Sequence, residues 1–73
     1  MHHFDGTSAR RRREALGLRR EEVAVRLRRS AESIAAYESG KVDPPASIVA
    51  QLADALSCDP GVLFTVEPLV GAA

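Results

Sequence analysis

Helix stop signals divide this sequence into short segments and constrain its fold more than any other feature. Gly17 and Gly40 each follow a short helical pattern, at the position where a left-handed residue commonly ends a helix. Pro44 and Pro45 cannot continue a helix, and they favour the start of a new one. Half-buried alternating runs, which would indicate strands, are missing from the sequence. We therefore expect an all-α fold, a compact bundle of about five short helices.

Apolar residues at helical spacing place these helices along the chain. The expected helices span residues 8–16, 20–28, 30–39 and 46–56, and a short fifth helix starts at Asp59 and Pro60 and carries Leu63 and Phe64. This arrangement predicts a flexible leader at residues 1–7, a domain at residues 8–65 and a tail at residues 66–73.

Local signals suggest how the helices begin and which faces are buried. Thr7 or Ser8 can cap the first helix, and Ser30 can cap the third. The expected inner face of the first helix is Ala9, Arg12 or Arg13, and Leu16. The other expected inward residues are Val23, Ala24, Leu27, Ile34, Tyr37, Val49, Leu52, Ala53 and Leu56.

Length and cysteine content exclude several classes of protein. The 73 residues suit one domain, and no apolar run approaches the roughly 18 residues that span a membrane. The single cysteine, Cys58, can form neither an internal disulfide nor a zinc finger, so we expect a small buried hydrophobe. The start "MHHFDG" lacks the features of a signal peptide. We expect a cytoplasmic protein.

The net charge of zero conceals two halves of opposite sign. All nine arginines lie between Arg10 and Arg29, so residues 1–29, with four acidic residues, carry a charge of +5. Residues 30–73 contain one lysine and six acidic residues, which gives −5. The asymmetry favours one basic face for a polyanion, and the alternative is solvated helix faces with internal ion pairs.

Two short helices separated by a three-residue turn make a helix-turn-helix pattern. In this sequence the pattern resembles the Cro/CI-type helix-turn-helix family of phage and bacterial regulators, with a lambda-repressor-like fold. The resemblance covers about two thirds of the chain, from Leu16 to Phe64. Its strongest signal is "EEVAVRL" at residues 21–27 followed by "SIAAYESGK" at residues 33–41.

The resemblance implies a role for individual residues. The third expected helix would be the recognition helix, which enters the major groove of DNA. Arg13 and Glu38 would form a structural ion pair between the first and third helices. The residues facing DNA bases would be Ala31, Glu32, Ser33 and Ala36. The residues meeting phosphates would be Arg19, Arg20, Arg28, Arg29, Ser30, Ser39 and Lys41.

The sequence departs from the family pattern in three places. Arg19 and Arg20 replace the serine or threonine and the glutamine that usually open the second helix. Arg28 replaces the turn glycine, the residue best suited to a positive φ. The recognition helix has almost no long donors, so we expect modest sequence preference and an affinity dominated by arginine–phosphate contacts. About five such contacts predict a slope of log K against log salt of about −4 to −5.

These observations lead to two hypotheses about function. The first is a DNA-binding transcriptional regulator whose partner is double-stranded DNA. The second is a protein-interaction module of the same fold, such as an antitoxin or an accessory factor of the transcription machinery. An enzyme, a cofactor, a small-molecule effector site within the chain and a metal site built on His2 and His3 are not expected.

A homodimer would suit a palindromic DNA site. The residues that are candidates for the dimer contact are Val66, Leu69 and Val70 of the apolar tail, together with the fifth helix. The alternative is that the tail packs on the core of its own chain.

Overall fold

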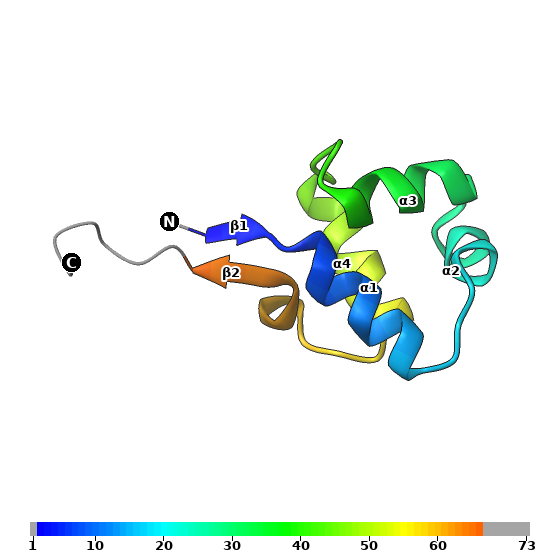
Figure 1. Ribbon diagram of the computed structural model, residues 1–73, viewed down its shortest axis with the longest axis horizontal. Coiled ribbons are helices and arrows are strands. Elements are labelled where there is room, and N and C mark those ends of the chain that lie inside the picture. Colours follow the sequence, from blue (N-terminus) through cyan, green and yellow to red (C-terminus); the bar gives the residue numbers. More distant parts are fainter. Residues whose placement is uncertain (1, 67–73) are drawn as a thin grey trace, which may run out of the picture.

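The computed structural model describes residues 2–66, which form four α-helices with a short two-stranded sheet at one end (Figure 1). The helices are α1 (Gly6–Ala15), α2 (Arg20–Leu27), α3 (Ala31–Ser39) and α4 (Ala46–Ala55). The strands are β1 (His2–Phe4) and β2 (Phe64–Val66), and the 3-10 helix η1 (Pro60–Leu63) precedes β2. The prediction of a compact helical bundle is confirmed, with four α-helices instead of about five.

The expected fifth helix is the single 3-10 turn η1. Asp59 caps it, because its carboxylate accepts a hydrogen bond from the Gly61 N–H at 2.9 Å. Phe64, which we expected on this helix, instead has extended backbone angles and begins β2. Asp59 and Pro60 therefore take the predicted cap and first positions, but of a 3-10 turn, and β2 begins before an α-helix can form.

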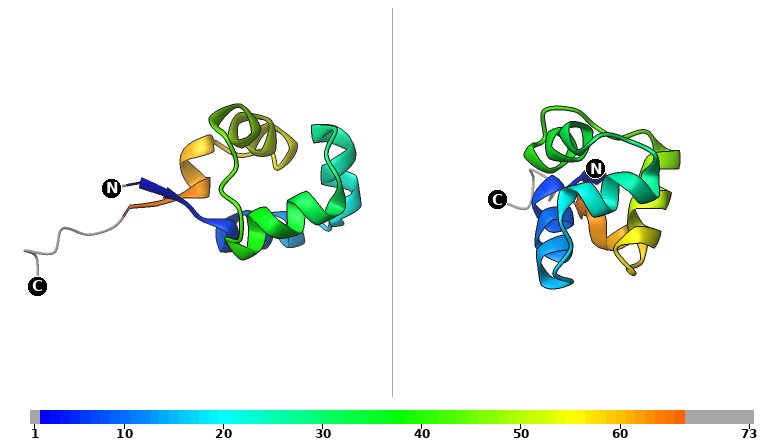
Figure 2. Two further views of the ribbon diagram at one scale, coloured as in Figure 1. Left: turned by 90° about the horizontal axis from the view of Figure 1, so that it is seen from above. Right: turned by 90° about the vertical axis from the view of Figure 1, so that its right-hand side faces the viewer.

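Strand β1 was not predicted, since residues 1–7 were expected to be a leader. β1 pairs antiparallel with β2, with Phe4 opposite Phe64. The two rings meet edge to face, with centroids 6.3 Å apart and an interplanar angle of 89°. This pairing joins the two ends of the described chain, and the strands project from the helices at the end opposite α2 (Figures 1 and 2).

Helix α1 begins earlier than expected because Asp5 is its cap, in place of Thr7 or Ser8. One oxygen of Asp5 accepts from the Ser8 N–H at 3.2 Å and the other from the Ser8 hydroxyl at 2.8 Å. The prediction that Leu16 faces inward was also wrong. The helix ends at Ala15, and Leu16 is 41% exposed.

The core lies between the four helices and follows the predicted apolar faces. Ala24 on α2 is 3% exposed, as expected for a small residue where α2 meets α3. Helix α3 lies over α1 (Figure 2), and Gly6 permits this close approach. A Cβ at Gly6 would collide with the backbone carbonyls of Tyr37 and Glu38. The buried hydrophobic residues are Ala9, Val23, Ala24, Leu27, Ile34, Tyr37, Ile48, Val49, Leu52, Ala53, Ala55, Leu56 and Leu63.

Cys58 packs partly buried against this core, close to its expected role. Burial raises the pKa of its thiol, which keeps the group neutral at ordinary pH. The described part of the chain contains no helix long and apolar enough to cross a membrane.

Candidate nucleic-acid interface

The exposed side of α3 borders an open groove. Its lining residues are Arg20, Ser30, Glu32, Ser33, Ala35, Ala36, Ser39, Lys41 and Val42. The groove brings together three of the four candidate base-facing residues and four of the seven candidate phosphate-contacting residues. Ala31 does not line it, and neither do Arg19, Arg28 and Arg29. Ala35 and Val42 also line the groove, although neither is among the candidate base-facing or phosphate-contacting residues.

Ser30 sets the start of α3, as predicted. Its backbone is extended, and its hydroxyl oxygen accepts a hydrogen bond from the Ser33 N–H at 3.1 Å. The hydroxyls of Ser30 and Ser33 also lie 3.1 Å apart and bond to each other. At the other end, the Ser39 hydroxyl donates to the Ala36 carbonyl at 3.2 Å. The serines of α3 are thus partly committed to the helix itself.

The turn between α2 and α3 forms with Arg28 in the left-handed region, at φ 56° and ψ 42°. Its N–H donates to the Val25 carbonyl at 3.2 Å, and the Arg29 N–H donates to the Ala24 carbonyl at 2.9 Å. A non-glycine residue in this conformation costs roughly 1–2 kcal/mol. Both arginine side chains are exposed, so the turn presents two cations to solvent next to the start of α3.

Helix α2 starts without a side-chain acceptor at its cap position, Arg19. Glu22 supplies half of a capping box, because its Oε1 accepts from the Arg19 N–H at 2.9 Å. The Arg19 Nε lies 3.5 Å from the same oxygen, and the side chain is 78% exposed. The backbone hydrogen bond from Arg19, with the nearby guanidinium, lowers the pKa of Glu22.

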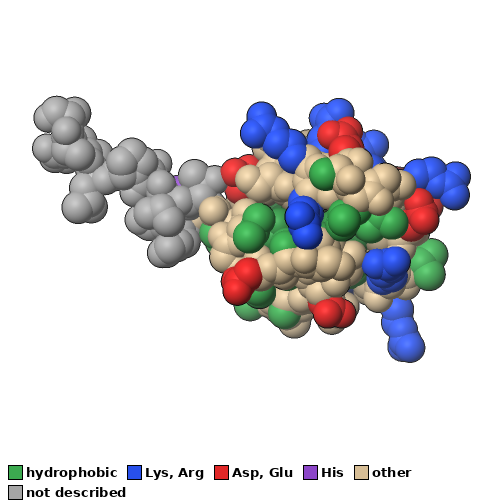
Figure 3. All heavy atoms as spheres, turned by 90° about the horizontal axis from the view of Figure 1, so that it is seen from below, with side chains coloured by type: hydrophobic (Ala, Val, Ile, Leu, Met, Phe, Trp, Pro, Cys, Tyr) green, Lys and Arg blue, Asp and Glu red, His purple; other side chains and the backbone are tan. Residues whose placement is uncertain are grey.

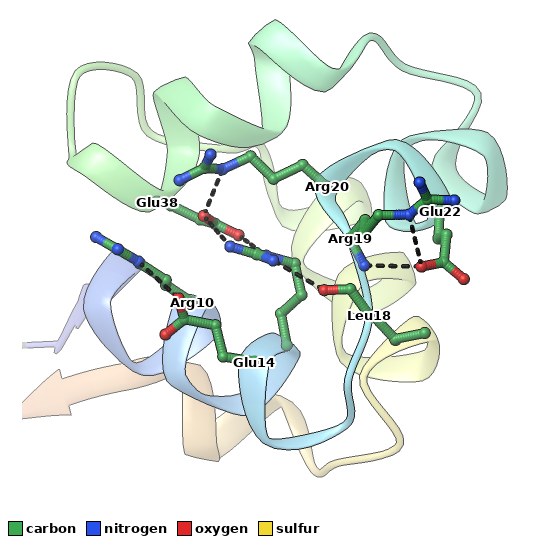
Figure 4. Close-up of polar contacts among 8 residues, drawn as sticks. Arg10, Glu14, Leu18, Arg19, Arg20, Glu22 and Glu38 are labelled. Atoms are coloured by element: carbon green, nitrogen blue, oxygen red, sulfur yellow. Dashed lines mark hydrogen bonds and ion pairs between the residues drawn. The ribbon is translucent and has the colours of Figure 1, made fainter.

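Glu38 of α3 binds two arginines (Figure 4). Arg13 of α1 approaches with Nε 2.6 Å from Oε2 and Nη2 3.2 Å from Oε1. Arg13 also donates to the Leu18 carbonyl at 2.8 Å. The second partner is Arg20 of α2, whose Nε lies 3.0 Å from Oε1. The Arg13–Glu38 pair implied by the resemblance is therefore present, whereas the Arg20 contact was missed.

Exposure separates the two arginines of this trio. The side chains of Arg13 and Glu38 are 9% and 5% exposed, and that of Arg20 is 40% exposed. The hydrogen bond that Arg13 donates to Glu38 raises the pKa of Arg13 above its ordinary value, so the buried guanidinium stays charged. Two arginines and one glutamate have a net charge of +1, and Arg20 is the member of the trio that lines the groove.

Two further arginines bind the C-terminal end of α4, a role that the sequence did not suggest. Arg12 donates from Nε to the Leu56 carbonyl and from Nη2 to the Ser57 carbonyl, both at 2.9 Å. Arg26 donates to the Ala55 carbonyl at 3.0 Å. Cations at this position donate hydrogen bonds to the last carbonyls of a helix and interact favourably with the negative end of its dipole.

Charged side chains of both signs lie on the face shown in Figure 3. On the face turned downward in Figure 1, basic side chains stand apart and acidic side chains lie between them (Figure 3). No group of three or more histidine, cysteine or acidic side chains that could hold a metal ion occurs in residues 2–66.

Comparisons with known proteins agree with this geometry. A family model described as a helix-turn-helix domain matches residues 6–63. Among solved structures, the restriction-modification controller protein C.AhdI from Aeromonas hydrophila is 29% identical, with a TM-score of 0.77 over 81% of this chain and 89% of its own. The P22 c2 repressor, solved with a synthetic operator, is 28% identical, with a TM-score of 0.75 over 80% and 88%.

The clp gene regulator ClgR from C. glutamicum shares the fold, with a TM-score of 0.75 at 22% identity over 80% of this chain and 75% of its own. No curated protein sequence matches significantly. The match to the family model covers most of the chain, including α1 through η1. The chain therefore belongs to the helix-turn-helix domain family.

Proposed function

We propose that this protein is a DNA-binding transcriptional regulator that places α3 in the major groove. The observation that carries the proposal is the groove along α3, where candidate base-facing residues lie beside the cations Arg20 and Lys41. The likeness to a repressor solved with a synthetic operator supports double-stranded DNA as the partner. The likeness to a restriction-modification controller protein supports a regulatory role. In a bacterial cell such a protein acts in the cytoplasm.

The exposed face of α3 offers limited direct readout. The residues proposed to face bases are Ala31, Glu32, Ser33 and Ala36. Glu32 can accept a hydrogen bond from cytosine N4, and the alanines can contact a thymine methyl group. The hydroxyl of Ser33 is shared with Ser30, which reduces its use as a reader.

Phosphate contacts would supply most of the affinity. Arg28 and Arg29 project from the turn, Arg19 stands at the start of α2, and Lys41 lies at the end of α3. Ser30 and Ser39 border the same groove and can donate to phosphate oxygens. Four cationic contacts predict a slope of log K against log salt of about −3.6. Arg20 differs from these cations because Glu38 holds its Nε.

A homodimer would place two copies of α3 about 34 Å apart on a palindromic site. Of the tail residues considered for this contact, Leu69 and Val70 lie outside the described residues, and Val66 belongs to β2. Sedimentation of the protein on palindromic and single half-site duplexes would measure the stoichiometry. Two copies on the palindrome and one on the half-site are expected.

The salt dependence of binding to random-sequence duplex DNA tests the proposal. We expect micromolar-range binding at low salt that weakens steeply as salt rises. Arg29→Ala should make the slope of log K against log salt less negative by about 0.9, because it removes one phosphate contact. Arg12→Ala is the matched control and should leave the slope unchanged, since Arg12 is bound to α4. Negligible binding at low salt would contradict the proposal and favour a protein-interaction module.

A further inference from the structure

The recognition helix lacks a donor for guanine. Arginine forking onto guanine O6 and N7 is the commonest specific contact in the major groove. Helix α3 carries no arginine or lysine, and its one long exposed side chain, Glu32, is an acceptor when ionised. Its remaining groove-lining side chains are alanines and serines. A small-residue helix can approach the base edges closely, and it leaves room for a longer side chain from a neighbouring element.

Arg20 of α2 is such a side chain. It lines the same groove as Ser33 and Ala36, and Lys41 is the other cation there. Its Nε is bound to Glu38, a residue of α3 itself, at 3.0 Å. Within residues 2–66 the Nη1 and Nη2 groups of Arg20 have no hydrogen-bond partner. The arginine is thus tied to the recognition helix by one nitrogen, with the two terminal nitrogens left for another molecule.

We propose that Arg20, held by Glu38, reads a guanine in the major groove and supplies the donor that α3 lacks. Nη1 and Nη2 form an end-on fork that matches guanine O6 and N7, and this fork does not require Nε. The inference rests on the proposed DNA-binding function and deepens it. It reassigns Arg20 from the phosphate contacts expected from the sequence to base readout.

The contact between Arg20 and Glu38 favours recognition of a base by Arg20 over a general contact with phosphate. Arg19, its neighbour, pairs loosely with Glu22 at 3.5 Å and is 78% exposed, so its guanidinium can follow whichever phosphate is near. Arg20 has a fixed nitrogen and therefore loses less rotamer freedom when it binds one defined pair of acceptors. The second arginine on Glu38 keeps the trio at a net charge of +1, so the carboxylate does not cancel the attraction of Arg20 for guanine.

Selection of bound sequences from random duplex DNA tests the assignment with the full chain. The parent protein should select a guanine at one position of each half-site. Replacing that guanine by another base should weaken binding about 5- to 150-fold. Arg20→Ala should lose this preference, because it removes both terminal nitrogens. Arg19→Ala is the matched control and should weaken binding while selecting the same sequence.

An altered base identifies the contacting atom. 7-Deazaguanine lacks the N7 acceptor. Placing it at the selected position should weaken DNA binding by the parent protein and leave binding by Arg20→Ala unchanged. If Arg20→Ala selects the parent's sequence, or the parent tolerates 7-deazaguanine at every guanine, Arg20 does not read a base. A parent that binds DNA without any selected guanine also overturns the inference, while the proposed function stands. Absence of DNA binding at low salt overturns both.

Discussion

Arg13 on α1 and Arg29 in the turn before α3 carry the same side chain in opposite surroundings. Arg13 is 8% exposed and gives hydrogen bonds to Glu38 and to the Leu18 carbonyl. Arg29 is exposed and, in the described part of the chain, has no side-chain partner. The arginine-rich half therefore contains two populations, one that holds helices together and one that is available to a polyanion.

Arg12 and Arg26 belong with Arg13, because their guanidinium groups bind the carbonyls that end α4. The charge of +5 on residues 1–29 therefore overstates the cations that are free for DNA. The location of each arginine on its helix, rather than the number of arginines, decides its role. Substitutions can test this division, since each group should respond to a different measurement.

The largest effect is expected for Glu38→Ala. The change leaves the Arg13 guanidinium buried without its carboxylate, and breaking a buried pair in this way costs about 3–5 kcal/mol. Urea denaturation followed by circular dichroism would measure the loss in free energy of unfolding. A loss of this size is a large fraction of the total stability of a small domain, which is about 5–15 kcal/mol.

Glu14→Ala is the matched control, because it removes an exposed pair on α1. Arg10 and Glu14 lie 3.3 Å apart, with side chains 55% and 53% exposed. Such a pair contributes about 0.3–0.5 kcal/mol. If the two variants lost similar stability, the distinction between buried and exposed arginines would fail.

Arg12→Ala should have the next largest effect on stability. It removes two charged hydrogen bonds from carbonyls at the end of α4 and should cost about 1–2 kcal/mol. The neighbouring Arg11 is exposed and its side chain makes no hydrogen bond or ion pair in the described chain, so Arg11→Ala should stay within about 0.5 kcal/mol. Thermal and urea unfolding of the two variants side by side would measure the difference. Equal losses would show that Arg12 does not anchor α4.

The sequence predicted the helices better than it predicted their ends and contacts. Periodicity and stop signals located α1 to α4 and most of the core, because a helix is specified by neighbouring residues. Strand β1 was missed since its partner β2 lies some 60 residues away and each strand has only three residues. Neither segment is long enough to show an alternating pattern.

Some polar contacts could be predicted from the sequence and others could not. The resemblance pointed to Arg13 and Glu38, but it could not reveal that Arg20 shares the same carboxylate, because this position is not an arginine in the family pattern. The contacts of Arg12 and Arg26 with α4 were equally hidden, since backbone carbonyls leave no signature in the sequence. The roles proposed for the groove residues remain predictions that follow from their position on α3.

Arg28→Gly tests the group of arginines that is available to a polyanion. Arg28 is exposed and has a left-handed backbone, so the fold should not need its side chain. Relief of the left-handed backbone, partly offset by the greater freedom of glycine in the unfolded chain, should raise the free energy of unfolding by about 0.5–1 kcal/mol. The slope of log K against log salt for DNA binding should become less negative by about 0.9. Arg29→Gly, at a position without positive φ, should lower stability instead. Unfolding and binding titrations on both variants check this pair of signs.

The smallest effect is expected for the exposed contact of Arg19 with Glu22, which helps to begin α2. The pKa of Glu22 is lowered in the folded protein, so its charge stabilises the fold above the ordinary carboxyl pKa of about 4.3. That contribution is lost as the pH falls through the lowered value. Glu22→Gln keeps an acceptor for the Arg19 N–H but has no charge, so it should be slightly less stable than the parent at neutral pH. The difference should shrink below about pH 4, and urea unfolding at pH 7 and pH 3 measures it. A difference that did not depend on pH would mean that the carboxylate acts at this cap only as a hydrogen-bond acceptor, without a contribution from its charge.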